Sequence, residues 1–196
     1  ATAHRRPLLQ RRGAELGGWT PGQRIALVAI LAERGLWEAG GPLGWKAVRG
    51  GGSLLEIMAP VWDAACGRGV PADRWAGFEH DLDDIGVLVD PDRFNAFGAY
   101  RGIGILRLAT RCCARGADAA STLDVARGSL GIAAGAFHSE DYVMRASIRE
   151  RWNTPAVQAE VELQRRVVER IRSVPRIDAK GARTLRREFL GIDETG

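Results

Sequence analysis

The chain has 196 residues, and its 45% apolar and 27% charged residues are ordinary for one large globular domain or two small ones. This composition excludes a mainly disordered chain, and no run of about 18–20 apolar residues is present that could span a membrane. Three cysteines without a Cys-x-x-Cys spacing argue against a disulfide framework and a zinc site. We therefore expect a soluble protein without a cofactor in a reducing compartment, cytoplasmic or inside an organelle and not secreted.

Residues 1–19 are predicted to form a basic N-terminal arm. The first twelve residues contain no acid, and they lack the apolar stretch of a secretory signal peptide. Such a composition is typical of a mature end left by organelle import and of a basic arm in a bacterial protein, and the sequence leaves both open. The arginines of the first twelve residues are Arg5, Arg6, Arg11 and Arg12.

A helical core domain is predicted over residues 20–152, and its first start signal is the clearest. Thr20 is a good N-cap, Pro21 suits the first helical position, and Gln23 completes a capping box, which predicts a helix over residues 21–37. A second capping box, Ser53-Leu-Leu-Glu56, and two further start signals, Pro71-Ala-Asp-Arg and Pro91-Asp92, follow. The further helices expected from these signals span residues 54–65, 71–86 and 91–115.

The rest of the chain also has helical spacing. An Ala/Gly-rich segment over 118–136 and a helix over 139–152 complete the predicted core, and a basic helical pair is expected over 153–196. In this pair the sequence Asn153-Thr-Pro155 is a start signal, and Glu162 precedes Arg166 by four residues, the spacing of an ion pair. Alternating β-branched runs are nearly absent. The prediction is an all-α fold, an irregular bundle of about seven or eight helices with glycine-rich connections. The apolar stripe expected on the first helix of the pair is Val157, Val161, Val168 and Ile171.

Charge is distributed in three blocks. Residues 1–24 have a net charge of +4, from five arginines and one Glu; residues 53–105 have −5, from nine acids and four arginines; residues 165–187 have +7, from nine basic groups and two acids. The overall +4 therefore conceals a basic, an acidic and a second basic region. All but two of the 28 basic residues are arginine, which binds carboxylates and phosphates in a two-point geometry.

The second basic region is the strongest candidate binding surface. Nine cations over two helices are enough to neutralise several phosphates, and the short break at 173–178 is similar to a helix-turn-helix connection. The alternative that involves no nucleic acid is a solvated helix face whose arginines contact acids of this chain or of a partner. The candidate binding residues, besides the arm, are Arg165, Arg166, Arg170, Arg172, Arg176, Lys180, Arg183, Arg186 and Arg187.

Two clusters of His and acids suggest a metal site as an alternative. His80 lies on the same helix face as Asp83 and Asp84, at i+3 and i+4, which is ligand spacing for a divalent metal. A second cluster, over residues 138–141, would supply the remaining ligands. The alternative without a metal is that the first cluster is a solvated acidic helix face and the second caps the start of a helix. The candidate ligands are His80, Asp83, Asp84, His138, Glu140 and Asp141.

Six tryptophans, most of them near the glycine-rich connections, allow two interpretations. Core packing explains most of them, and an exposed subset at a protein interface is the functional alternative. Their positions are 19, 37, 45, 62, 75 and 152.

Polarised charge without a coherent catalytic constellation favours a non-enzymatic subunit or adaptor of a larger assembly. We expect it to dock through its arginine-rich ends onto an anionic partner, a protein or a nucleic acid. Two alternatives stay open: a metal-dependent hydrolase that uses the His/Asp clusters, and a DNA-binding regulator that reads DNA with residues 155–190. The electrostatic hypothesis requires that the cations face outward and are not satisfied by acids of the same chain.

Overall fold

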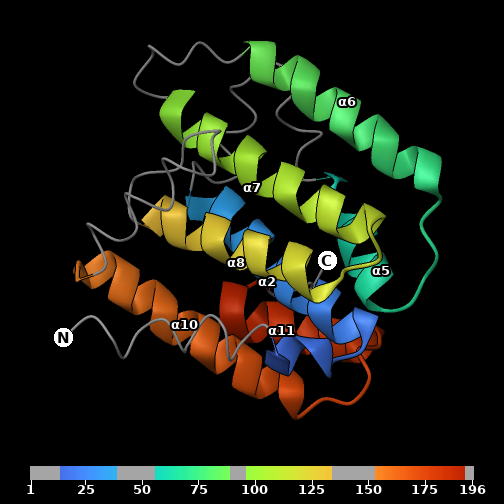
Figure 1. Cartoon of the computed structure of the whole chain (residues 1–196), viewed down its shortest axis with the longest axis vertical. Coiled ribbons are helices and arrows are strands. Elements are labelled where there is room, and N and C mark those ends of the chain that lie inside the picture. The colour runs from blue at the N-terminus through green and yellow to red at the C-terminus, as the bar shows by residue number, and fades with distance from the viewer. Residues whose placement is uncertain (1–13, 39–55, 89–95, 134–152, 193–196) are drawn as a thin grey trace.

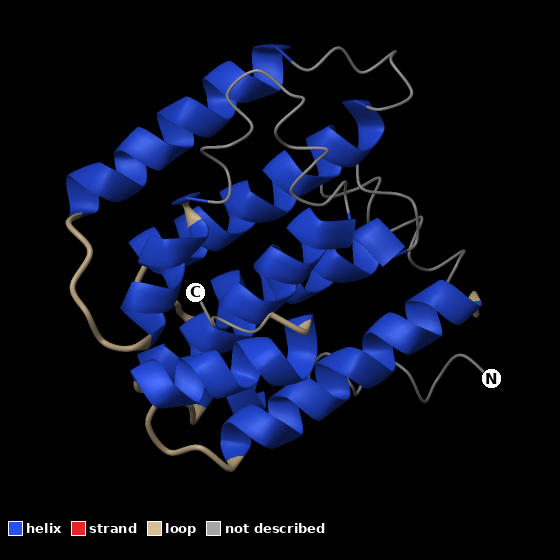
Figure 2. Cartoon of the chain, turned by 180° about the vertical axis from the view of Figure 1, so that it is seen from behind, coloured by secondary structure: helices blue, strands red, loops and turns tan. Residues whose placement is uncertain are grey.

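The computed structural model describes residues 14–38, 56–88, 96–133 and 153–192, and every regular element in these ranges is a helix (Figure 1, Figure 2). The all-α prediction is therefore confirmed. A helical turn over 14–17 precedes seven longer helices, close to the expected number. These seven are α2 (Pro21–Glu38), α5 (Met58–Ala65), α6 (Ala72–Leu88), α7 (Ala96–Ala114), α8 (Ala119–Ala133), α10 (Pro155–Arg172) and α11 (Ala179–Leu190).

Local capping explains where α2 and α10 begin. The backbone N–H of Thr20 donates to Gln23 Oε1 at 3.0 Å, and the Gln23 N–H donates to Thr20 Oγ1 at 3.3 Å, so the predicted capping box of α2 is present. Thr154 accepts from the N–H of Val157 and thus caps α10, as its sequence predicts. The Ser53 capping box and the helix expected over 139–152 lie outside the described residues.

Helix α2 forms the centre of the bundle. Its residues 26–32 are at most 2% exposed, and α5, α7, α8, α10 and α11 all pack against it. A helix that is apolar on every side is buried on every side. The core is therefore arranged around the first long helix of the chain, and the elements that cover it come from all later parts of the sequence (Figure 1).

Two glycines of α2 allow the neighbouring helices to approach closely. A Cβ atom at Gly22 would lie 2.7 Å from the carbonyl oxygen of Ala65, at the end of α5, which is closer than side chains tolerate. A Cβ at Gly35 would lie 3.1 Å from Cγ2 of Ile105 on α7. Gly22 thus fixes the distance between α2 and α5, and Gly35 helps fix that between α2 and α7.

Helix α6 packs on the outside of α7 and carries much of the acidic block (Figure 1). Its buried side includes Trp75 and Leu82. On its rim Glu79 pairs with Arg111 of α7 at 2.7 Å, and Asp83 pairs with Arg107. The acids of α6 therefore meet arginines of α7, and among the described residues they form no ion pair with the C-terminal cations.

Helices α10 and α11 are attached to α2 by polar side chains as well as apolar ones. The Gln23 side-chain amide donates to the carbonyl oxygens of Ile171 and Val174, at 3.4 and 3.0 Å, where α10 ends. Of the predicted stripe on α10, Val161 is partly buried and the other three residues are buried. The described parts of all three predicted domains share one core. That division stays a prediction.

The buried face of α10 also carries polar groups that the stripe did not include. The Glu160 carboxylate is 2% exposed; it pairs with Arg34 of α2 and accepts from Ser129 Oγ at 2.6 Å and Gln164 Nε2 at 2.9 Å. A buried charge with three donors is fully satisfied, so this cluster fastens α10 to α2 and α8.

Candidate functional site: the basic surface of α11 and an adjoining pocket

The arginines of α10 are largely paired within the chain. Arg165 pairs with Glu162 at 2.6 Å and with Glu169 at 2.9 Å. The hydrogen bonds from Arg165 also hold the pKa of the Glu162 carboxyl below its ordinary value. Glu162 forms its ion pair with Arg165, and the charge of Arg166, four residues after Glu162, also lowers the pKa of this carboxyl. The Arg166 guanidinium lies 5.9 Å from the centre of the Phe189 ring.

The remaining arginines of α10 bridge to other elements. Arg170 pairs with Glu188 of α11 at 3.0 Å, and Arg172 pairs with Glu15 in the turn before α2. These ion pairs bear on the hypothesis that the C-terminal cations are not satisfied by acids of the same chain. Four of the nine C-terminal cations, Arg165, Arg170, Arg172 and Arg186, form ion pairs with carboxylates of the same chain, and none of those carboxylates belongs to the acidic block over 53–105.

Helix α11 differs, because one of its faces presents cations without carboxylate partners. Lys180, Arg183 and Arg187 follow one another at i, i+3 and i+7, so they form one stripe about 10.5 Å long at 1.5 Å per residue. All three are exposed, as is Arg176 in the connection before the helix. None of the four has an ion-pair partner among the residues that the structure describes. We call Lys180, Arg183 and Arg187 the α11 basic surface.

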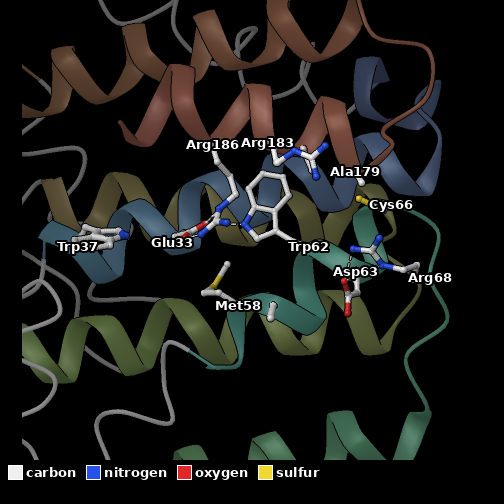
Figure 3. Close-up of a pocket in the computed structure, with 12 residues that line it drawn as sticks. Glu33, Trp37, Met58, Trp62, Asp63, Cys66, Arg68, Ala179, Arg183 and Arg186 are labelled. Carbon is white, nitrogen blue, oxygen red and sulfur yellow. Dashed lines mark hydrogen bonds and ion pairs between the residues drawn. The ribbon is translucent and has the colours of Figure 1, made fainter. Parts of the chain in front are cut away.

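A pocket of about 400 Å³ adjoins this surface, between α2, α5 and α11 (Figure 3). Trp62 and Met58 of α5 and Ala182 of α11 give it apolar walls. In Figure 3 Trp37 lies on one side of Trp62, and Cys66 and Arg68 lie on the other. Arg183 belongs both to the basic surface and to the lining of the pocket. The other lining residues are Glu33, Ala59, Asp63, Ala179 and Arg186.

The polar wall of the pocket is centred on Glu33, which is 4% exposed. Arg186 donates through Nη2 and Nε to the two carboxylate oxygens, at 2.7 and 3.2 Å, and Trp62 Nε1 donates to Oε2 at 2.7 Å. The Arg186 guanidinium also lies 6.0 Å from the centre of the Trp62 ring. Because three donors satisfy it, Glu33 is a structural anchor of α5 and α11 and is not available as a base or a metal ligand.

The other carboxylate of the pocket, that of Asp63, is also neutralised by an arginine. Arg68 donates twice to Asp63 Oδ1. Burial raises the pKa of the Cys66 thiol, so at neutral pH Cys66 is a thiol and a poor nucleophile. The pocket therefore has no activated catalytic group among these residues. Arg183 is its one described cation without a carboxylate partner, which suits the pocket to binding an anionic, partly apolar group.

The other predicted site residues are not brought to this pocket. Nε2 of His80 lies 3.6 Å from Oδ2 of Asp84, both side chains are mostly exposed, and Asp83 is paired with Arg107. Among the described residues no group of three His, Cys, Asp or Glu could hold a metal. The partner residues of the predicted metal site and the arginines of the arm lie outside the described residues, so both remain predictions. They are His138, Glu140, Asp141, Arg5, Arg6, Arg11 and Arg12.

Sequence reasoning missed the pocket. Its signal was a single acid, Glu33, within the apolar sequence Leu27 to Trp37, at a position that the helical period turns toward the core. A carboxylate on the buried side of a helix requires a partner. The sequence does not say which of the many arginines provides it.

Comparisons with known proteins identify the fold. No family model matches the chain, and no curated protein matches it. Among solved structures, the crystal structure of a DUF416 family protein from Shewanella baltica OS155 superimposes with a TM-score of 0.69 at 16% sequence identity, covering 91% of this chain and 93% of that one. At this identity the similarity shows a shared all-α fold and nothing about activity. No described helix has the length and apolarity needed to cross a membrane.

Proposed function

We propose that this protein is a non-enzymatic helical subunit or adaptor that docks through the α11 basic surface onto an acidic protein partner. The observation that carries the proposal is the contrast between adjacent helices. The exposed cations of α10 are largely neutralised by Glu residues of the chain, whereas Lys180, Arg183 and Arg187 have no such partner among the described residues. Exposed like charges along one helix face repel each other, and an anionic partner relieves that cost.

A protein partner is favoured over nucleic acid for two reasons. First, α10 presents Glu162 and Glu169 beside its arginines, and these carboxylates repel phosphates. Second, the basic surface adjoins a pocket with apolar walls, and apolar contact belongs to the core of protein interfaces. Four of the nine C-terminal cations are already paired with carboxylates. This leaves Arg166, Arg176 and the three residues of the α11 basic surface to contact phosphates. The arginines of the N-terminal arm stay a further predicted contact.

The direct test compares two triple variants of equal charge change. One neutralises the α11 basic surface (Lys180→Gln, Arg183→Gln, Arg187→Gln), and the other neutralises paired cations of α10 (Arg165→Gln, Arg170→Gln, Arg172→Gln). Binding to a dye-labelled acidic peptide of about twelve Glu and Asp residues, and to a duplex DNA of about twenty base pairs, is measured by anisotropy between about 50 and 300 mM NaCl. We expect the α11 triple to lose at least tenfold affinity for the peptide and the α10 triple less than about twofold.

Several results would contradict the proposal. An equal loss in both triples would show that only net charge matters. Duplex binding that is tighter than peptide binding, with a log–log salt slope near −8, would mean that about nine phosphates are contacted and would favour the DNA-binding regulator. A stoichiometric metal in the purified protein, lost in His80→Ala, would favour the hydrolase.

A further inference from the structure

We infer that the acidic partner carries an aromatic or large aliphatic side chain beside its carboxylates, and that this anchor enters the pocket between α2, α5 and α11. The inference rests on the proposed function and deepens it, because it specifies the segment that is recognised: an acidic stretch interrupted by one large apolar residue.

The walls of the pocket fit such an anchor. Trp62 and Met58 line it from α5, and Ala182 lines it from α11. Trp37, at the end of α2, is 39% exposed, and among the described residues it is the only exposed large hydrophobic side chain. A volume of about 400 Å³ lies within the range of ligand pockets, and most of the binding energy of protein interfaces comes from a few large side chains that fill such pockets.

The charges of the pocket determine what accompanies the anchor. Glu33 is neutralised by Arg186, and Asp63 by Arg68, so these four groups neither repel nor require a charged ligand. Among the described residues Arg183 has no carboxylate partner, and it lies at the edge that the pocket shares with the α11 basic surface. A carboxylate next to the apolar anchor would pair with it in two-point geometry.

The length of the basic surface sets the spacing of the recognised segment. An extended peptide advances about 3.4 Å per residue, so the 10.5 Å from Lys180 to Arg187 corresponds to about three residues. The geometry thus requires two or more acids within about three positions of the anchor. A uniformly acidic segment would pair with the α11 basic surface and leave the pocket empty. An apolar segment without acids would fill the pocket and leave the basic surface without partners.

The test uses two labelled peptides of identical charge, each an acidic twelve-residue chain with one central residue, Phe in the first and Ser in the second. We expect the full-length protein to bind the Phe peptide at least tenfold more tightly than the Ser peptide. Ala59→Trp fills the pocket from an exposed position on α5 and should remove this preference while the affinity for the Ser peptide is unchanged. Ala76→Trp, at an exposed position on α6 away from the pocket, is the matched control and should keep it.

Trp37→Ala provides a second variant, which removes an exposed wall without altering the core and should reduce the preference at least threefold. Equal affinity of the two peptides, with binding still lost in the α11 triple, would overturn the anchor and leave the proposed function intact. Peptide binding that is indifferent to the α11 triple would overturn the proposed function. A preference for Phe that survives both Ala59→Trp and Trp37→Ala would place the anchor elsewhere and contradict the inference.

Discussion

Helices α10 and α11 are similarly rich in arginine, and they differ in what surrounds those charges. In α10 Arg165 lies between Glu162 and Glu169, one turn away on either side, and pairs with both. Helix α11 has one acid, Glu188, which is taken by Arg170 of α10. A count of cations, four in each helix, treats the two alike, but their ion-pair partners separate a surface neutralised within the chain from one that is open to a partner.

The two helices also differ in how each is fastened to α2. Helix α10 contributes a buried carboxylate, Glu160, to an arginine of α2, whereas α11 contributes an arginine, Arg186, to a buried carboxylate of α2. Both are salt bridges in which one member is nearly inaccessible to water. Breaking them tests how firmly each helix is attached, and changing their exposed charges tests what each surface does.

The largest effect is expected at the anchor of α10. Arg34→Met leaves the Glu160 carboxylate buried without its cation, and removing one member of a buried ion pair costs about 3–5 kcal/mol. Urea unfolding followed by circular dichroism measures the loss. Arg34→Lys keeps the charge and should recover part of it. A loss below about 1 kcal/mol would mean that Glu160 is not held as described.

The anchor of α11 should matter less. Arg186→Met removes two charge-assisted hydrogen bonds from Glu33, but Glu33 and Arg186 both line the pocket, so water can reach the carboxylate once the guanidinium is gone, and we expect a loss of about 2–3 kcal/mol. The same unfolding experiment applies. A larger loss than that of Arg34→Met would reverse the order of the two anchors.

Exposed charges should have small effects of opposite sign on the two helices. Arg170→Gln removes a bridge to Glu188 and should lower the free energy of unfolding by about 0.5–1 kcal/mol. Arg187→Gln removes a cation four residues from Arg183 and should leave stability unchanged or raise it by about 0.2–0.5 kcal/mol. Both are measured in low salt, because about 1 M NaCl screens these differences. Equal losses would indicate that Arg187 has a partner in solution.

The smallest expected effect concerns pH. Because Arg165 lowers the pKa of Glu162 in the folded chain, the pair contributes fully above the ordinary pKa of 4.5 and is lost as the pH falls through the lower, folded value. An NMR titration of the Glu162 side chain should therefore have its midpoint below 4.5, and Arg165→Gln should move it upward. A midpoint unchanged by this substitution would show that the pairing of Glu162 with Arg165 does not persist in solution.

The sequence predicted the helices well because their signals are local. Thr20 to Gln23 and Thr154-Pro155 are complete within four residues, so no distant contact is needed to interpret them. The bounds of α11 are set by equally local features, because Asp178 caps its first turn and Gly191 takes the left-handed conformation that ends it.

The site could not be predicted in the same way, because it depends on partners that are distant in the sequence. Glu33 and Arg186 are 153 positions apart. Whether Arg165 or Arg183 is neutralised depends on the rotation of each helix about its axis and on its neighbours. Helical spacing allows Glu162 to pair with either Arg165 or Arg166. The ion pair forms with Arg165, and the Arg166 guanidinium lies over Phe189 on α11.

The central position of α2 has a consequence for synthesis on the ribosome. Residues 26–32 are covered by helices that extend to residue 190, and the Gln23 side chain binds carbonyl oxygens at 171 and 174. The central helix is thus translated early and covered late. At about 5–20 residues per second, the roughly 150 residues between the ends of α2 and α11 take about 8–30 seconds to synthesise, and α2 is not fully covered before then. Completion of the native core therefore depends on nearly the whole chain having emerged.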